Sequence, residues 1–252
     1  MPYLTAGYPD LATSKELILT AARNGADIIE IGIPFSDPLA DGPILQMAAV
    51  ESLKGGATIA KIMDMVGCAA RQIRKEELST ELVFMVYYNL VYCWGEDRFV
   101  EAASQAGVAG LIVPDLPYEE AACLEEKASK AGIDLVYLVA PNTPAERIKA
   151  IGERSKGFVY AVSLTGVTGP REQLPADLVE LVNRIKENVD LPVAVGFGVS
   201  SAEQAAEVAG IADGVIVGSA LAKLIQEAGR DSCTAVEGFI KKLRSALNNH
   251  SE

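Results

Sequence analysis

The length, composition and charge of the chain already exclude several classes of protein. Of its 252 residues, 50% are hydrophobic and 22% are charged, which allows a sizeable core and excludes disorder as the main state. This length suits one barrel-sized domain or two small ones. The formal net charge of −12 opposes binding to nucleic acid or to an anionic membrane, and we expect neither as a partner.

Cysteine and histidine are sparse, which narrows the possible chemistry. Cys68, Cys93, Cys123 and Cys233 are too far apart for a zinc site or a disulfide framework and suit a reducing compartment. We find neither a basic leader segment nor an apolar run of membrane-spanning length, so we expect a cytoplasmic protein. The one histidine, His250, lies in the polar tail, so we expect neither a histidine base nor a histidine-bound metal.

Short apolar, β-branched runs alternate with amphipathic stretches along the whole chain. This alternation predicts βα units around a parallel sheet. The predicted strands are residues 2–5, 27–31, 82–86, 110–113, 134–139, 158–163, 192–195 and 214–217. The predicted helices include residues 11–24, 58–74, 97–106, 119–131, 145–152, 176–188, 201–209, 220–226 and 234–248.

Eight strands that are apolar on both faces fit a closed (β/α)8 barrel, a TIM barrel of parallel strands, better than an open sheet. Gly25, Gly107 and Gly132 each follow a predicted helix, where a left-handed C-cap requires a residue without a Cβ. No proline-rich or serine-rich linker interrupts the pattern, so we predict one domain over residues 1–252. In such a barrel the chemistry lies where the strands end and the βα loops begin.

A carboxylate interrupts the second predicted strand, which ends IIEI at residues 28–31 and is followed by Gly32. Val, Ile or Leu normally fills a barrel interior, and burial there would raise the pKa of Glu30 toward neutrality. A glutamate of that kind suits general acid–base catalysis. The alternative is a structural Glu30 that pairs with a buried partner or lies at a splayed strand end.

The loop that follows, residues 34–43, contains three prolines and two aspartates. Its second aspartate, Asp41, can reach the same pocket and supply a second carboxylate. The spacing also allows Asp41 to be a turn residue or the N-cap of a helix that begins near Ile44.

Glycines cluster after each of the last three predicted strands. The segments are residues 163–169 (SLTGVTG), 196–201 (GFGVSS) and 218–220 (GSA), the last of which opens a helix. Backbone N–H groups beside glycines can approach an anion closely, and a helix N-terminus adds its dipole. We therefore predict a phosphate site, which barrels often place after strands seven and eight. The alternative is that these glycines serve turn geometry alone.

The residue inventory disfavours two other chemistries. No lysine falls at the C-terminal end of a predicted strand, where a Schiff-base aldolase would need one. The histidines on which metal-dependent epimerases of this fold rely are absent. We therefore expect a phosphorylated ligand handled by one or two carboxylates, with no metal, no cofactor and no covalent intermediate.

Residues 25–43, GADIIEIGIPFSDPLADGP, match the signature of a known family nearly throughout, and similarity extends to residues 114–117, 164–169, 195–199 and 218–220. On these motifs the sequence resembles the tryptophan synthase alpha chain family over essentially its whole length. The resemblance implies a TIM barrel that cleaves indole-3-glycerol phosphate to indole and glyceraldehyde 3-phosphate in tryptophan biosynthesis. It also implies a pyridoxal-phosphate beta chain as partner, in an expected α2β2 heterotetramer, to which indole passes through a tunnel.

The resemblance assigns roles residue by residue. It implies that Glu30 is the catalytic acid–base and that Asp41 faces the indole N–H. Tyr160 matches a tyrosine beside the catalytic glutamate, and Tyr3 takes the place of an aromatic residue of the indole pocket that is usually Phe. Thr168 matches the lid threonine that contacts the catalytic aspartate. The implied phosphate-binding residues are Gly169, Gly198, Gly218 and Ser219.

Retro-aldol cleavage needs a proton on indole C3 and the loss of a proton from the 3′-hydroxyl group of the glycerol chain. A Glu30 with a raised pKa can transfer these protons, while an ionised Asp41 stabilises positive charge that develops at the indole nitrogen. Two carboxylates in unequal environments thus divide the work.

The loop of residues 34–43 is the family's contact with the beta chain and is intact here. This favours an alpha subunit over the alternative, a self-sufficient lyase that releases free indole. Retention of both Glu30 and Asp41 argues against a non-catalytic subunit that only activates the beta chain. Family members usually carry a helix ahead of the first strand, across the bottom of the barrel. Because Met1 falls directly against that strand, we expect a trimmed start or an absent cover, with apolar surface exposed below.

Overall fold

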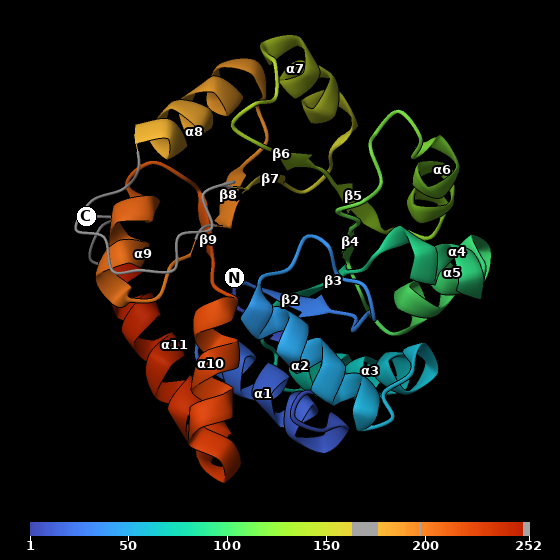
Figure 1. The fold of residues 1–252 in the computed structure, drawn as a ribbon, viewed down its shortest axis with the longest axis vertical. Coiled ribbons are helices and arrows are strands. Elements are labelled where there is room, and N and C mark those ends of the chain that lie inside the picture. Colours follow the sequence, from blue (N-terminus) through green and yellow to red (C-terminus); the bar gives the residue numbers. More distant parts are fainter. Residues whose placement is uncertain (163–175, 197, 249–252) are drawn as a thin grey trace.

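The computed structural model describes residues 1–162, 176–196 and 198–248, in which parallel strands form a ring inside a layer of helices (Figure 1). The strands are β1 (Tyr3–Thr5), β2 (Ile28–Gly32), β3 (Glu81–Met85), β4 (Gly110–Ile112), β5 (Asp134–Val136), β6 (Leu138–Val139), β7 (Val159–Val162), β8 (Val193–Gly196) and β9 (Gly214–Ile216). The helices are α1 (Leu11–Arg23), α2 (Pro43–Lys54), α3 (Ile59–Lys75), α4 (Tyr88–Trp94), α5 (Glu96–Gln105), α6 (Ala122–Lys130), α7 (Ala145–Arg154), α8 (Ala176–Asn188), α9 (Ala202–Ala209), α10 (Ser219–Ala228), the 3₁₀ turn η1 (Gly229–Asp231) and α11 (Ser232–Asn248).

Backbone hydrogen bonds close the ring at both points where the named sheets end. Strands β1 to β5 form one parallel sheet and β6 to β9 form another. The Tyr3 N–H donates to the Val217 carbonyl at 2.8 Å, and the Val217 N–H donates to the Met1 carbonyl at 2.9 Å. Between β5 and β6, the Tyr160 N–H donates to the Tyr137 carbonyl at 3.0 Å. The predicted barrel is therefore confirmed, with its fifth strand divided at Tyr137.

The other predicted strands agree with the described ones to within about a residue at each end. The predicted left-handed glycines are confirmed as well, since Gly25, Gly107 and Gly132 have φ angles of +90°, +81° and +72°. The sequence pattern missed α4, a short helix that follows β3 directly. A helix of two turns provides too few residues for a clear period.

Successive side chains of a strand point to opposite faces of the sheet, so the strands contribute to two hydrophobic cores, one between the strands and the helices and one inside the barrel. On β2, Ile29 and Ile31 are fully buried between the strands and the helices, whereas Ile28 packs inside the barrel. The period of two therefore directs Glu30 into the barrel interior. The interior cluster consists of Val83, Ile112, Val136, Phe158, Tyr160, Ala194 and Ile216.

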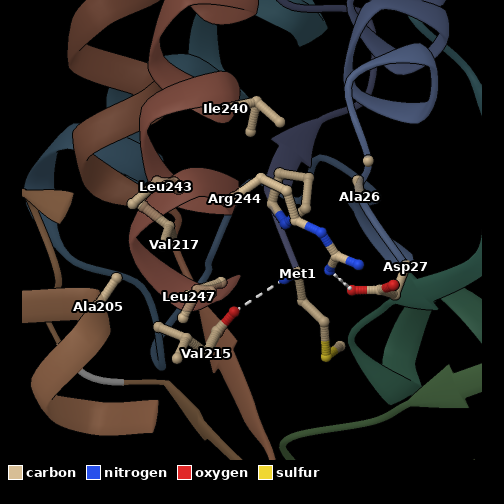
Figure 2. A pocket seen from close by; sticks show the side chains of 12 residues that line it. Met1, Ala26, Asp27, Ala205, Val215, Val217, Ile240, Leu243, Arg244 and Leu247 are labelled. Atoms are coloured by element: carbon tan, nitrogen blue, oxygen red, sulfur yellow. Dashed lines mark hydrogen bonds and ion pairs between the residues drawn. The ribbon is translucent and has the colours of Figure 1, made fainter. Parts of the chain in front are cut away.

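The N-terminal ends of the strands border a small hollow of about 40 Å³, lined mostly by apolar side chains (Figure 2). Arg244 of α11 and Asp27, just ahead of β2, form an ion pair of 2.8 Å at this end of the barrel. Ligand pockets typically have volumes of roughly 300 Å³ or more, so this hollow is too small for a substrate. In the described ranges, no helix is long and apolar enough to cross a membrane.

Candidate active site

Glu30 lies at the centre of β2, paired in register with Tyr3 of β1 and Val83 of β3. Its side chain is fully buried, and neither carboxylate oxygen has a hydrogen-bond partner among the described residues. Burial is the main cause that raises the pKa of Glu30 to about 8. The charged amino group of Met1 lowers this pKa, and the negative charge of Asp41 raises it. Within the described residues Glu30 is thus not a paired structural carboxylate, and it holds its proton at neutral pH.

Asp41 lies on the loop between β2 and α2 and is partly buried. Burial raises its pKa to about 6, and hydrogen bonding by the Tyr87 hydroxyl lowers it. The N-cap of α2 is Gly42, so Asp41 does not cap that helix. Its N–H donates to the Pro38 carbonyl at 3.1 Å, and its own carbonyl accepts from the side chain of Gln46 at 2.8 Å. Asp41 is therefore a turn residue whose carboxylate is ionised at neutral pH.

Two buried tyrosines complete the group of side chains around these carboxylates. Tyr3 of β1 is 7% exposed and Tyr160 of β7 is 9% exposed. Burial raises the pKa of each well above its usual value, and the charges of Glu30 and Asp41 raise both further. The structure thus brings these four side chains together. Tyr3 and Glu30 come from the neighbouring strands β1 and β2, Asp41 comes from the loop after β2, and Tyr160 comes from β7, on the opposite side of the barrel.

Glycines at two strand ends make room for these tyrosine rings. A side chain at Gly32, the last residue of β2, would overlap the Tyr3 hydroxyl group, and one at Gly196, the last residue of β8, would overlap Tyr160. Gly196 belongs to the run that the sequence suggested as a phosphate site, but its missing side chain serves tyrosine packing. Residue spacing could not reveal this contact, because it depends on the register of neighbouring strands.

The residues expected to bind phosphate lie, where described, after β8 and β9. Gly198 is exposed, and a Cβ there would meet no atom of the described residues within 4 Å. Gly218 is the N-cap of α10, Ser219 is its first residue, and a Cβ at Gly218 would lie 3.4 Å from Tyr3. Thr168 and Gly169 lie outside the described residues. In the part of the chain that the structure describes, no three His, Cys, Asp or Glu side chains are grouped to hold a metal.

Sequence reasoning did not single out Tyr87, which contacts the loop of Asp41. Its hydroxyl oxygen accepts a hydrogen bond from the Ala40 N–H at 3.0 Å, and its ring centroid lies 5.3 Å from that of Phe35. The available signal was its position, one residue past the end of a predicted strand, where barrel enzymes carry their functional side chains.

A closed parallel barrel with one carboxyl group inside it, on β2, and a second of lower pKa on the loop that follows is the arrangement of a TIM-barrel enzyme that uses acid–base chemistry. The model of the family described as tryptophan synthase alpha chain matches residues 1–250. The chain belongs to this family.

Relatives and solved structures agree over nearly the full length. A tryptophan synthase alpha chain of Dehalococcoides mccartyi is 44% identical over 98% of this chain and 94% of its own length. One of Prochlorococcus marinus is 47% identical over 98% of this chain and 88% of its own length. Tryptophan synthase of Mycobacterium tuberculosis superposes with a TM-score of 0.89 at 38% identity, over 98% of this chain and 91% of that one. The subunit alpha of Legionella pneumophila gives 0.89 at 37% identity, over 98% and 92%.

Proposed function

We propose that the chain works as a single barrel domain in which Glu30 and Asp41 divide the acid–base work of a retro-aldol cleavage. The reaction is that of its family: the chain is a lyase that cleaves indole-3-glycerol phosphate to indole and glyceraldehyde 3-phosphate, as an alpha subunit in tryptophan biosynthesis. Family membership supports this role and not that of a self-sufficient lyase. The observation that carries the proposal is a fully buried Glu30 whose two carboxylate oxygens have no partner in the described residues.

The protonation state of Glu30 suits both proton transfers of the cleavage. With a pKa of about 8, Glu30 is a carboxylic acid at neutral pH and can donate its proton to indole C3. The ring then accepts the electron pair of the breaking bond between C3 and the glycerol chain. The Glu30 carboxylate formed in the first transfer accepts the proton of the 3′-hydroxyl group as that carbon becomes an aldehyde. Glu30 ends the cycle protonated, so no external acid is needed.

Asp41 supplies charge where Glu30 supplies a proton. Its pKa of about 6 leaves it ionised at neutral pH, and it can stabilise the positive charge that develops at the indole nitrogen. Tyr3 and Tyr160 stay neutral, because their pKa values are raised well above the usual one, and they form aromatic walls beside the carboxyl groups. We assign the indole ring to this half of the site.

The phosphate group of the substrate is assigned to the ends of β8 and β9. Gly198 leaves open space there, and Ser219 begins α10, whose N-terminal N–H groups and dipole attract an anion. Gly169 and the lid residue Thr168 complete the proposed binding set, although both lie outside the described residues. Glycine at these positions lets the backbone approach the phosphate oxygens.

The family functions with a beta chain as partner. We assign an α2β2 heterotetramer in the cytoplasm, with the loop of residues 34–43 as the contact with the beta chain. Within this loop Leu39 is 94% exposed, although it is a large apolar residue, which supports a covering partner. Cys68, Cys93, Cys123 and Cys233 are all free, which supports a reducing compartment.

Release of indole from indole-3-glycerol phosphate, with and without a beta chain, tests the proposed function. If docking of the beta chain raises the fraction of molecules whose loop places Asp41 in the site from ~1% to ~50%, kcat rises roughly fifty-fold. The rise should saturate with partner concentration, and Asp37→Ala should reduce the rise more than the basal rate. Absence of indole release in the presence of a beta chain would refute the proposal.

A further inference from the structure

Tyr87 contacts the loop between β2 and α2 from outside it, at two separate points. It lies between β3 and α4, and it is 5% exposed. Its ring packs beside Phe35, with 5.3 Å between centroids and 32° between planes, and its hydroxyl oxygen accepts the Ala40 N–H at 3.0 Å. Phe35 lies near the beginning of the loop and Ala40 directly precedes Asp41. One side chain therefore holds both ends of the segment that carries the aspartate.

The loop's own hydrogen bonds are local by comparison. The Leu39 N–H donates to the Asp37 carbonyl at 3.0 Å, and the Asp41 N–H donates to the Pro38 carbonyl at 3.1 Å. The bond from Gln46 to Asp41 reaches only the helix that follows the loop. Within the described residues, the hydrogen bond from the Ala40 N–H to Tyr87 is the one that ties residues 36–41 to the segment between β3 and α4.

The Tyr87 hydroxyl has the donors and acceptors for two partners. Its oxygen accepts the Ala40 N–H, which leaves its own O–H free to donate to the Asp41 carboxylate. This second bond lowers the pKa of Asp41, opposing burial, which raises it to about 6. Burial and then the charge of Asp41 raise the pKa of Tyr87, so the phenol stays protonated and remains a donor.

We propose that Tyr87 is a positioning residue for the cleavage: its ring holds the start of the loop at Phe35 and its hydroxyl group holds the other end at Ala40, which keeps the Asp41 carboxylate in the site. This inference rests on the proposed role of Asp41. Tyr87 acts through Asp41 and needs no contact with the substrate. Removing the hydroxyl group alone breaks both of its hydrogen bonds and leaves the ring contact with Phe35.

The pH dependence of this pair can be assigned, because the other titratable groups that face it are known. They come from β1, β2, β7 and the segment after β4, and they are Tyr3, Glu30, Tyr160 and Asp115. Both tyrosines have raised pKa values and stay neutral, and Glu30, with a pKa of about 8, stays protonated while Asp41 titrates near 6. The acidic limb of a plot of kcat/KM against pH therefore reports Asp41 together with the second ionisation of the substrate phosphate, which is the same for wild type and variant, so a difference between them reports Asp41.

Tyr87→Phe is the test, with Tyr88→Phe as the matched control. The neighbouring Tyr88 also places its hydroxyl group on a carboxylate, but that carboxylate is Glu96 at 2.8 Å, on the outer helix α5. Loss of a hydrogen bond to a charged group predicts that Tyr87→Phe lowers kcat/KM at neutral pH by roughly tenfold or more. The acidic limb should also move to higher pH, because the bond that lowers the pKa of Asp41 is gone. Tyr88→Phe should leave the limb where it is.

Two further measurements separate positioning from a general loss of structure. In an Asp41→Asn background, Tyr87→Phe should have little additional effect on kcat, because the carboxylate through which it acts is absent. The ¹³C-carboxyl signal of Asp41, which needs no turnover, should titrate at higher pH in folded Tyr87→Phe than in the wild type. An unchanged Asp41 titration, or full additivity with Asp41→Asn, would overturn the inference. A wild type that releases no indole would refute the proposed function instead, and the titration would still test the contact.

Discussion

Strand β2 and the loop that follows it each bring one carboxyl group to the same site, but they control it in different ways. Glu30 is held by strand pairing on both sides, with Tyr3 and Val83 as register partners, and has no hydrogen-bond partner in the described residues. Asp41 lies on a loop whose tip is exposed at Leu39, and Tyr87, between β3 and α4, holds that loop at Ala40. The strand thus provides an acid without solvent contact, and the loop provides a charge.

This difference produces two protonation states from nearly the same chemical group. Burial dominates at both residues, but it is complete at Glu30 and partial at Asp41, where the Tyr87 hydroxyl also favours the ionised form. The resulting pKa values of about 8 and about 6 leave one group neutral and the other charged between these limits. Pairs of carboxyl groups whose environments separate their pKa values commonly divide acid and charge roles in catalysis.

Removing the strand-held acid should have the largest effect. Glu30→Gln keeps the size of the side chain but cannot transfer a proton, so kcat should fall by about 10² to 10⁴. Affinity for the substrate should stay within a few fold, because Glu30 makes no hydrogen bond to any other described residue that the substitution could break. Steady-state kinetics, with circular dichroism to establish folding, measure this. Near-normal turnover in the folded variant would remove Glu30 from the mechanism.

Removing the charge of the loop-held carboxylate should cost somewhat less. Asp41→Asn keeps the shape of the side chain but cannot stabilise a developing positive charge, so kcat should fall by roughly 10² to 10³, as for other electrostatic stabilisers of transition states. Single-turnover measurements with the beta chain present separate this effect from partner docking. If the variant retained the wild-type rate, Asp41 would be only a turn residue.

A substitution in the proposed phosphate site, at the ends of β8 and β9, should raise KM and leave kcat nearly unchanged. Gly198→Val places a side chain where no atom of the described residues lies within 4 Å of the Cβ, so the fold should tolerate it while the substrate phosphate loses its place. We expect KM to rise about tenfold or more, equivalent to ~1.4 kcal/mol or more of lost binding. Gly238→Val on α11, where a Cβ also meets nothing within 4 Å, is the control. Equal KM values in the two variants would place the phosphate elsewhere.

Stability should show the smallest effect, and its sign follows from the raised pKa of Glu30. The folded state binds the Glu30 proton more tightly than the unfolded state, whose pKa is the ordinary 4.5. The resulting stabilisation is fully present below pH 4.5 and is lost as the pH rises through about 8. Urea unfolding should therefore show the wild type losing stability relative to Glu30→Gln between about pH 4.5 and about pH 8, with a level difference at higher pH. A constant difference would mean that Glu30 is not desolvated.

Much of this fold could be predicted from sequence patterns that depend on the conformational preferences of residues close together in the chain. Apolar β-branched runs predicted the barrel strands, and glycines after helices predicted left-handed caps such as Gly25. The same reasoning singled out Glu30, because a carboxylate among isoleucines is costly unless it has a use. Composition and hydrophobic periodicity depend only on residues that are close in sequence, and they were sufficient to predict the strands and the helix ends.

Contacts between distant segments were not predictable in this way. The overlap of Tyr160 with the space beside Gly196 depends on the register of β7 against β8, and the hold of Tyr87 on Ala40 depends on how a loop folds back over the next strand. The sequence around these residues does not indicate either contact, since a tyrosine near a strand end is equally compatible with simple packing. For the same reason the sequence could not decide between a turn, a cap and a catalytic group at Asp41.

The central claim is that Glu30 is neutral and Asp41 ionised at neutral pH. Titration of the free enzyme labelled with ¹³C at the side-chain carboxyl carbons of Asp and Glu, with signals assigned through Glu30→Gln and Asp41→Asn, measures this directly. The Glu30 signal should titrate near pH 8 and the Asp41 signal near pH 6. Two signals that both titrate near the ordinary values of 4.5 and 3.8 would contradict it.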